Sequence, residues 1–294
     1  MAEQPNSKVR SAATSLEAAT LTPAPSSGRI KKAVLISMLP KNQSYVDRFK
    51  LARDIGFEAV ETETAEDPKV AEEIKKASED AKLPIHSVMN MAHWDNPLSS
   101  SDTAVVKKSL DGMRTSLHNA KLWGADTVLL VPGLVNADIS YQDAWTRSQE
   151  HIRTLIPLAE KLKVIIAIEE VWNKFLLSPL EMASYVDEFE SPWIKSYFDV
   201  GNVVIHGYPQ HWIHTLGKRL VKVHLKDFKV LSHGFSPFRT EFVNLGDGDI
   251  DWSAVRKAFA DVGYTGYATT ELDPGDEAYL RDVVKRIDRL VLGL

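Results

Sequence analysis

The sequence contains no cysteine, which excludes disulfide bonds, thiolate nucleophiles and cysteine-ligated metal sites. It also has no long hydrophobic run. The longest apolar stretches, such as residues 127–131 and 164–168, are far shorter than the roughly 20 residues that a membrane-spanning helix needs. We therefore expect a soluble protein with no membrane partner.

An excess of positive charge is missing as well. Lysine and arginine together number 35 against 40 aspartate and glutamate residues, so the formal net charge is −5. Tight binding to a nucleic-acid backbone depends on clustered lysine and arginine, and this balance argues against a nucleic-acid partner. The 294 residues, 44% of them hydrophobic, suffice for one large core.

The first 29 residues differ in composition from the rest. They are rich in alanine, serine, threonine and proline and show no sustained apolar periodicity. We predict a disordered leader over residues 1–29 and a catalytic domain over residues 30–294. The leader lacks the apolar segment and the arginine pair of an export signal, so a cytoplasmic location is the default expectation. A trimmed or degenerate export leader is the alternative.

From residue 30 onward a short β-rich apolar run is followed by a longer helical segment, and the pair recurs eight times. The intervening segments carry helical spacing, as with Val106, Leu110, Met113 and Leu117. Ser178 and Asp67, each followed by proline, have the character of helix N-caps. The eight predicted strands are Ala33–Met38, Phe57–Thr62, Pro84–Val88, Asp126–Val131, Val164–Ile168, Ile194–Phe198, Leu220–Leu225 and Tyr267–Thr270.

Eight β-then-α units in series, with strands that lack polar alternation, predict an α/β fold with a single (β/α)8 TIM barrel. A doubly wound open sheet is the structural alternative. That fold usually has a glycine-rich phosphate turn after its first strand, whereas residues 39–43 here contain no glycine. The closed barrel is therefore the favoured architecture.

Ionisable residues stand at the ends of many of these strands. Glu61 and Glu63 end the second strand and His86 lies in the third. The last four strands end in a second group: Glu169-Glu170, Asp199, His224 with Lys226, and Glu271. Catalytic groups of a barrel lie at the carboxyl ends of its strands, and buried charges are costly unless they are paired or bind a metal. Three carboxylates and one imidazole predict a cation site that favours Mn²⁺, Mg²⁺ or Co²⁺.

Strand parity limits this prediction. Glu169 and Glu170 are adjacent, so their side chains point to opposite faces of the strand and only one can enter the barrel. The residues alone do not decide which one. His224 and Lys226 share a face, which places Lys226 one step nearer the mouth. It either holds a substrate oxygen there or is a solvated loop lysine.

Five motifs resemble the xylose-isomerase-like barrel superfamily over residues 30–290, and within it the sugar-phosphate isomerase/epimerase group. They are EVWNKF at 170–175, DVGN at 199–202, HLKD at 224–227, GDGDIDW at 246–252 and TEL at 270–272. The resemblance implies that Glu170, Asp199, His224 and Glu271 are metal ligands, and that Glu170 and Glu271 are the two acid/base groups. The implied cofactor is a divalent metal, with Mn²⁺ first and Mg²⁺, Co²⁺ or Zn²⁺ as alternatives.

The implied reaction is the isomerisation or epimerisation of a sugar or sugar phosphate by proton abstraction next to a carbonyl, through a metal-stabilised enediolate. We expect the small-molecule carbohydrate to contact His86, Trp94, Asn173, Asn202 and Lys226. Many members of the group are dimers or tetramers, so a homo-oligomer is a further expectation from the resemblance.

Two departures from ketose 3-epimerases put activity on free sugars in question. Asn202 occupies a position where they commonly have histidine, and no arginine follows the strand-7 histidine before Arg239. A lyase or dehydratase acting on 3-keto-glycosides or inososes is the main alternative, because the same proton abstraction begins that chemistry. A phosphodiester-cleaving endonuclease with three metals is the third hypothesis, but this sequence lacks most of the histidines that such a site needs. A binding protein with an inactive barrel is the fourth.

The segment from Asp227 to Asp249 is long for a connection between a strand and a helix, and it contains Phe235, Phe238 and Phe242. Long loops in compact domains are often lids or interface segments. We expect this segment to close the site or to contact a second subunit.

Overall fold

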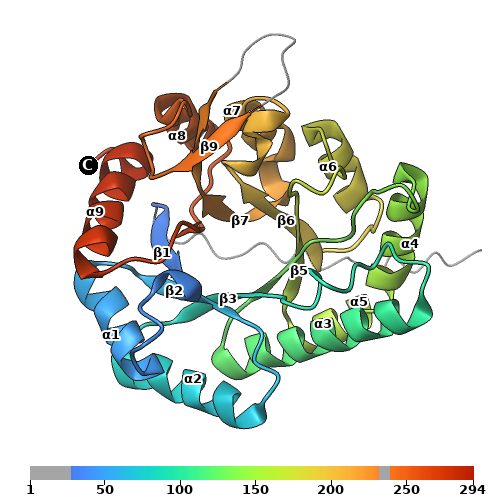
Figure 1. The fold of residues 1–294 in the computed structure, drawn as a ribbon, viewed down its shortest axis with the longest axis horizontal. Coiled ribbons are helices and arrows are strands. Elements are labelled where there is room, and N and C mark those ends of the chain that lie inside the picture. Colours follow the sequence, from blue (N-terminus) through green and yellow to red (C-terminus); the bar gives the residue numbers. More distant parts are fainter. Residues whose placement is uncertain (1–27, 232–238) are drawn as a thin grey trace, which may run out of the picture.

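The computed structural model describes residues 28–231 and 239–294. The predicted leader therefore lies almost wholly outside the described residues, as do Phe235 and Phe238. In the described part, eight parallel strands close into a barrel in the order β1-β10-β7-β6-β5-β4-β3-β2, with helices around it (Figure 1). The predicted (β/α)8 barrel is confirmed.

The strands of the barrel are β1 Lys31–Leu35, β2 Ala59–Glu63, β3 Ile85–Met89, β4 Thr127–Leu130, β5 Ile165–Glu169, β6 Ile194–Asp199, β7 Leu220–Leu225 and β10 Tyr267–Thr270. The α-helices are α1 Tyr45–Ile55, α2 Pro68–Ala81, α3 Thr103–Trp123, α4 Tyr141–Arg153, α5 Ile156–Leu162, α6 Pro179–Asp187, α7 Pro209–Leu216, α8 Trp252–Asp261 and α9 Glu277–Ile287. Short helical turns are η1 Ile36–Met38, η2 Asn202–Ile205, η3 Gly217–Arg219 and η4 Asp288–Leu292.

Two hydrophobic layers hold this architecture together. The larger lies between the outer surface of the strands and the surrounding helices. The smaller lies inside the barrel and consists of Leu35, Met89, Leu129, Val131, Ala167 and Tyr197. Because side chains alternate along a strand, β1, β3, β4, β5 and β6 supply residues to both layers, which explains why strands such as β4 and β5 are nearly continuous apolar runs.

The predicted helix boundaries are confirmed where capping chemistry sets them. Ser178 caps α6 in a reciprocal capping box with Glu181, and the Asp67 carboxylate accepts the N–H of Lys69 at the start of α2. Gly56 and Gly124 end α1 and α3 in the left-handed conformation, which glycine adopts without the steric cost that other residues incur.

The structure departs from the predicted elements at two places. The first predicted strand divides into β1 and the short helix η1. The predicted strand-7 loop contains an antiparallel hairpin of β8 Asp227–Val230 and β9 Thr240–Val243. Both strands have only four residues, too few to show a clear alternating pattern, and this is why the sequence did not reveal them.

Gly201 sets how closely the turn after β6 approaches the chain after β7. A methyl group on Gly201 would lie 2.5 Å from Cβ of Lys226 and 3.2 Å from the Lys226 carbonyl carbon. These distances leave no room for a side chain, so the two loops touch through glycine.

We expect Gly201→Ala to lower the free energy of unfolding by about 1–3 kcal/mol, the usual cost of overpacking. Gly207→Ala is the matched control in the same connection, because the nearest atom to its new methyl group would be 3.6 Å away. Urea denaturation of both variants measures the difference. Equal stabilities would show that the backbone after β7 moves to accommodate the added methyl group at little cost.

Candidate active site

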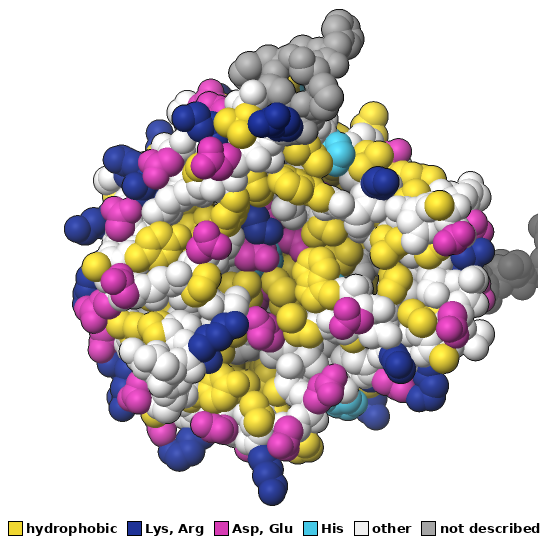
Figure 2. Space-filling view, in the orientation of Figure 1, with side chains coloured by type: hydrophobic (Ala, Val, Ile, Leu, Met, Phe, Trp, Pro, Cys, Tyr) yellow, Lys and Arg dark blue, Asp and Glu magenta, His cyan; other side chains and the backbone are white. Residues whose placement is uncertain are grey.

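Four ionisable side chains from neighbouring strands meet at the carboxyl end of the barrel. Glu169 ends β5, Asp199 ends β6, His224 lies in β7, and Glu271 follows β10. One ligand-type atom from each lies within 4.8 Å of the others. Seen from one end of the barrel, acidic and basic side chains occupy a central hollow with hydrophobic side chains around it (Figure 2).

His224 lies at the middle of this cluster. Its Nδ1 is 2.9 Å from Oε1 of Glu169, 2.8 Å from Oε2 of Glu271 and 3.9 Å from Oδ2 of Asp199. The ammonium of Lys226 lies 3.0 Å from Oδ2 of Asp199 and 2.9 Å from Oε2 of Glu271. The predicted position of Lys226, one step nearer the mouth than His224, agrees with these contacts.

In the structure Glu169, rather than Glu170, lies in this four-residue cluster, and the role of Glu170 as a metal ligand stays a prediction. Ala167 lies in the hydrophobic layer inside the barrel, and the two-residue period of a strand carries Glu169 to the same side. Glu170 follows the end of β5, and its Oε1 accepts the backbone N–H of Asp199 at 3.0 Å. The motif resemblance had selected Glu170, whereas strand parity had left the choice open.

The donor set fits a divalent cation. Three carboxylates and one imidazole are ligands that hard or borderline divalent ions accept. Oδ2 of Asp199 and Oε2 of Glu271 are buried and accept no hydrogen bond of good geometry, although cationic groups lie close to both. These two oxygens therefore have coordination capacity left for an ion. Oδ1 of Asp199 accepts the N–H groups of Gly201 and Asn202 at 2.7 and 2.9 Å, which fixes the orientation of the carboxylate.

The electrostatics of the cluster shift the pKa values of its carboxyl groups in opposite directions. Burial raises the pKa of Glu169 to about 7, even though the neighbouring His224 opposes that rise. Burial would also raise the pKa of Glu271, but His224 and Lys226 outweigh it and hold that pKa below its ordinary value. Burial lowers the pKa of His224, but Glu61, Glu271 and Glu169 more than compensate and place it well above the ordinary value.

Glu170 has a different environment from the cluster beside it. Burial, followed by the negative charges of Glu169 and Asp199, raises the pKa of Glu170 well above its ordinary value. Its Oε2 is buried and accepts no hydrogen bond.

Glu61 of β2 lies on the other side of the His224 ring. Both carboxylate oxygens of Glu61 are 3.3 Å from Nε2 of His224, and the side chains of Ser87 and Tyr197 also donate to Glu61. The sequence marked Glu61 as a charged residue in a strand but gave no sign of its partner, because the two residues are 163 positions apart.

His86 lies deep inside the barrel. Its ring stacks on Tyr267, the first residue of β10, and its Nε2 is 2.9 Å from Oγ1 of Thr269. Glu271, at the mouth, is four residues beyond Tyr267, which corresponds to about 13 Å along the strand direction. The register between β2 and β3 shifts beside His86, so it and Ser87 both reach the interior. The predicted substrate contact of His86 stays a prediction.

Asn173 and Asn202 brace loops through backbone groups. The Asn173 amide donates to the carbonyl of Gly133, and its oxygen accepts the N–H of Phe175 at 3.1 Å. The Asn202 amide donates to the carbonyl of Glu170 at 3.0 Å. These bonds give both asparagines a structural role, and the predicted contact with a substrate stays a prediction.

Two tryptophans lie on the rim with about half of their surface exposed. Trp172 donates from its ring nitrogen to the carbonyl of Asn202 at 2.8 Å and packs against Phe228. Trp94 packs edge-on against His93, with ring centroids 4.4 Å apart. Exposed aromatic faces of this kind can stack on a sugar ring, as predicted for Trp94, and the contact stays a prediction.

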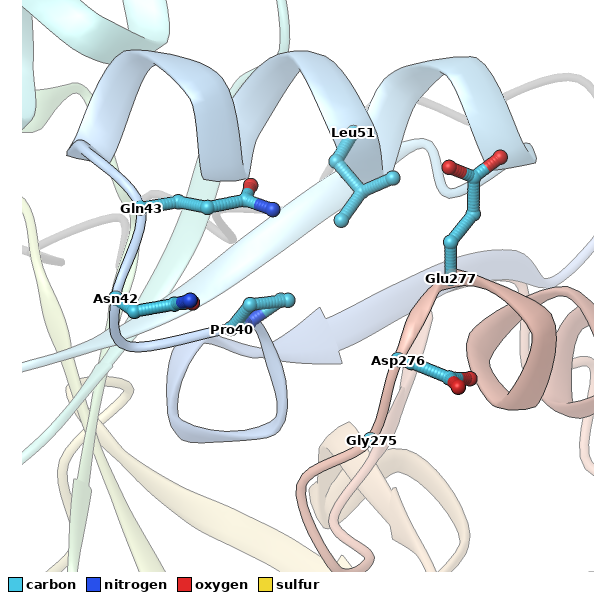
Figure 3. A pocket seen from close by; sticks show the side chains of 7 residues that line it. All are labelled: Pro40, Asn42, Gln43, Leu51, Gly275, Asp276 and Glu277. Carbon is cyan, nitrogen blue, oxygen red and sulfur yellow. The ribbon is translucent and has the colours of Figure 1, made fainter.

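A separate surface pocket of about 380 Å³ lies between the loop after β1 and the start of α9 (Figure 3). Pro40, Asn42 and Gln43 line one side, and Gly275, Asp276 and Glu277 line the other. It contains none of the clustered residues, and Asp276 is the N-cap of α9. The pocket is therefore a feature of the outer rim and not part of the carboxylate–imidazole cluster.

The predicted lid segment begins as the β8–β9 hairpin. Asp227 anchors it, because Oδ2 of Asp227 accepts the N–H of Gly246 at 2.7 Å and the indole N–H of Trp252 at 2.8 Å. Phe242 of β9 packs against Phe228 of β8. The tip of the hairpin lies outside the described residues, so closure over the site stays a prediction.

Comparison with known proteins gives one family and a consistent set of relatives. A family model described as "Xylose isomerase-like TIM barrel" matches residues 49–290. The L-ribulose-5-phosphate 3-epimerases of Shigella boydii serotype 18 and Escherichia coli O1:K1 are each 25% identical over 287 residues, covering 88% of this chain and 95% of theirs.

Solved structures share the fold. A D-tagatose 3-epimerase-like protein superposes with a TM-score of 0.75 at 17% identity, covering 90% of this chain and 99% of its own. A 3-keto-D-glucoside 4-epimerase from E. coli gives 0.71 at 16% identity, covering 87% of this chain and 98% of its own. Among the described residues, no helix has the length and apolar character needed to cross a membrane.

His93 gives the site a testable dependence of stability on pH. Burial lowers the pKa of His93 to about 3, with a partial opposing effect from Glu271, and Nδ1 of His93 accepts the N–H of Val131 at 3.2 Å. An unfolded histidine titrates near pH 6.5. The stabilisation from neutral His93 is therefore complete above pH 6.5 and is lost as the pH falls from 6.5 toward 3.

We expect His93→Asn to flatten the dependence of unfolding free energy on pH between 6.5 and 4.5, by up to about 1.4 kcal/mol per pH unit. The asparagine oxygen can still accept the N–H of Val131, and urea denaturation across this range measures the slope. His211→Asn, at an exposed histidine, controls for the loss of an imidazole. Parallel curves for wild type and His93→Asn would rule out a buried neutral His93.

Proposed function

The chain belongs to the xylose isomerase-like TIM barrel family, and on this premise we propose that it is a sugar epimerase or isomerase. It would act by removing a proton from the carbon beside a carbonyl group. The relatives at 25% identity, which align over nearly their whole length, carry an epimerase name and support this class of reaction.

The observation that carries the proposal is the placement of two carboxylates on either side of the cluster. Epimerisation needs a proton removed on one face of a carbon and returned on the other. Glu169 ends β5 and Glu271 follows β10, with β6 and β7 between these strands in the barrel. A substrate carbon held between the two side chains would present opposite faces to them, so one carboxylate takes the proton and the other returns it.

Glu169, Asp199, His224 and Glu271 would hold the divalent metal. When bound, the ion would supply Lewis-acid stabilisation for negative charge on the substrate carbonyl oxygen. The Lys226 ammonium, beside Asp199 and Glu271, would donate to a substrate oxygen on the mouth side of the site. Mn²⁺ is the metal we propose first, since oxygen ligands outnumber nitrogen ligands here.

A ketose or ketose phosphate is the substrate class that we propose. The sequence relatives are named for a ketose phosphate, and structures of the same fold include epimerases named for D-psicose and L-ribulose. These names favour epimerisation over the lyase or dehydratase alternative. A cytoplasmic location and a homo-oligomeric state stay predictions.

Solvent exchange of a substrate proton tests the proposed step directly. The protein is stripped of metal with a chelator, restored with Mn²⁺, and incubated in D₂O with ketoses, ketose phosphates and 3-keto-glycosides. Deuterium incorporation is read by NMR. We expect incorporation that depends on metal, and a reduction of about 10²–10⁴-fold in Glu169→Gln and in Glu271→Gln, the usual contribution of a general acid or base.

Glu170→Gln is the matched control on the adjacent residue. An amide oxygen can replace Oε1 as the acceptor of the Asp199 N–H, so the substitution keeps this hydrogen bond. We expect its exchange rate to stay within about tenfold of wild type, well short of the loss given above for an acid/base group. Loss of exchange in Glu170→Gln with retention in Glu169→Gln would assign the acid/base role to Glu170 instead. Metal-loaded protein that exchanges no compound in the panel would refute the proposed substrate class.

A further inference from the structure

We propose that Glu61 is a positioning residue that holds His224 with Nδ1 turned toward the cluster. The inference rests on the proposed function, because it concerns the presentation of one ligand of that same site. Glu61 itself does not reach the carboxylate–imidazole cluster, and it would act only through the His224 ring.

The geometry places the two nitrogens of His224 in different surroundings. Nδ1 faces Glu169 and Glu271 at 2.9 and 2.8 Å, on the side where the four ligand-type atoms gather. Nε2 faces both oxygens of Glu61 at 3.3 Å. The ring and the Glu61 carboxylate are completely buried, so water does not compete for this contact.

Both ring nitrogens of His224 face carboxylate oxygens, so both can donate hydrogen bonds in the structure as described. A metal ion at the cluster would replace the proton on Nδ1, and the proton on Nε2 would then donate to Glu61. Carboxylate groups behind metal-ligating histidines fix the tautomer and orientation of the ring in the same way. In the described part of the chain, His224 is the basic side chain that lies within 4.0 Å of Glu61.

The other partners of Glu61 determine which of its two oxygens has no other hydrogen bond and faces Nε2 of His224. The hydroxyl of Ser87 donates to Oε2 at 2.8 Å, and the hydroxyl of Tyr197 donates to the same oxygen. In Glu61→Gln, the amide oxygen keeps both of these hydrogen bonds when it occupies the Oε2 position, so this orientation of the amide is favoured. The amide NH₂ then takes the Oε1 position and points at Nε2 of His224.

An NH₂ group in that position would donate to Nε2 and so move the ring proton to Nδ1, the nitrogen that has to bind the metal. A similar exchange of carboxylate for amide stabilises the wrong histidine tautomer in other active sites. The substitution therefore retains the volume of the side chain but reverses the tautomer that it favours.

The test is the affinity of the full-length protein for Zn²⁺, a diamagnetic probe, measured by competition with a chelator. We expect Glu61→Gln to weaken binding about 10–100-fold, the usual effect of removing an outer partner of a histidine ligand. Nitrogen-15 NMR of the histidine rings should show His224 protonated on Nε2 in zinc-loaded wild type. The same ring should be protonated on Nδ1 in the metal-free variant.

Three variants separate positioning from structural support. Glu63→Gln removes the same charge from the same strand, and Tyr197→Phe removes a donor to Glu61 but keeps the carboxylate. Both should retain zinc affinity within about threefold of wild type, well below the loss for an outer partner of a histidine ligand. Glu61→Asp, which keeps an acceptor toward Nε2, should bind zinc more tightly than Glu61→Gln. Thermal melts of the variants report stability separately from affinity.

Unchanged zinc affinity in folded Glu61→Gln, with His224 still protonated on Nε2, would overturn the proposal. A variant with lower melting temperature but normal affinity would assign Glu61 a structural role alone. These outcomes differ from failure of the proposed function, in which wild type binds zinc but catalyses no proton exchange. Wild type that fails to bind zinc would refute both proposals.

Discussion

The burial of four acidic or ligand-type groups at one end of the barrel is the constraint on which the rest of the structure depends. Glu169, Asp199 and Glu271 bring three acidic groups into a small volume, where charges are costly unless they are paired or bind a metal. His224 and Lys226 lie between these carboxylates and balance part of their charge. A divalent cation in the same volume would complete the balance, which links the electrostatics of the fold to the proposed chemistry.

Strand order makes this cluster possible. The strands β5, β6, β7 and β10 are successive neighbours in the closed barrel, so residues at their carboxyl ends converge on one side of the mouth. The turn after β6 adds precision, because its backbone N–H groups hold Asp199 while Asn202 holds the carbonyl of Glu170. Gly201 permits this turn to contact the chain at Lys226. The loops that border the site are thus fixed by the same residues that orient its ligands.

The sequence predicted the barrel well because eight alternating units leave few other topologies, and because capping residues mark the helix ends. It predicted the level of the ligands from strand ends but could not choose between Glu169 and Glu170. That choice depends on which face of β5 meets the interior, a property of the closed sheet. The depth of His86 could not be predicted for a similar reason, since the register shift between β2 and β3 breaks simple alternation. The β8–β9 hairpin gave no signal because its strands are so short.

The interior of the barrel is divided between an apolar and a polar side, and this division accounts for the contacts of His224. Leu129, Val131 and Ala167 fill the side formed by β4 and β5. On the other side, the Tyr197 hydroxyl lies between Glu61 and Thr269, and Thr269 contacts His86. Buried polar groups are stable only when they have partners, so this row of hydrogen-bonded side chains forms as a unit.

Replacing the polar side with hydrophobic residues could preserve or increase stability, because buried charges rarely repay the cost of removing them from water. An apolar interior could not, however, support Nε2 of His224 from below while Nδ1 faces the carboxylates above. The polar column beneath the mouth is therefore best explained by the requirements of the site. The fold itself would tolerate an interior of packed aliphatic side chains, as other barrels do.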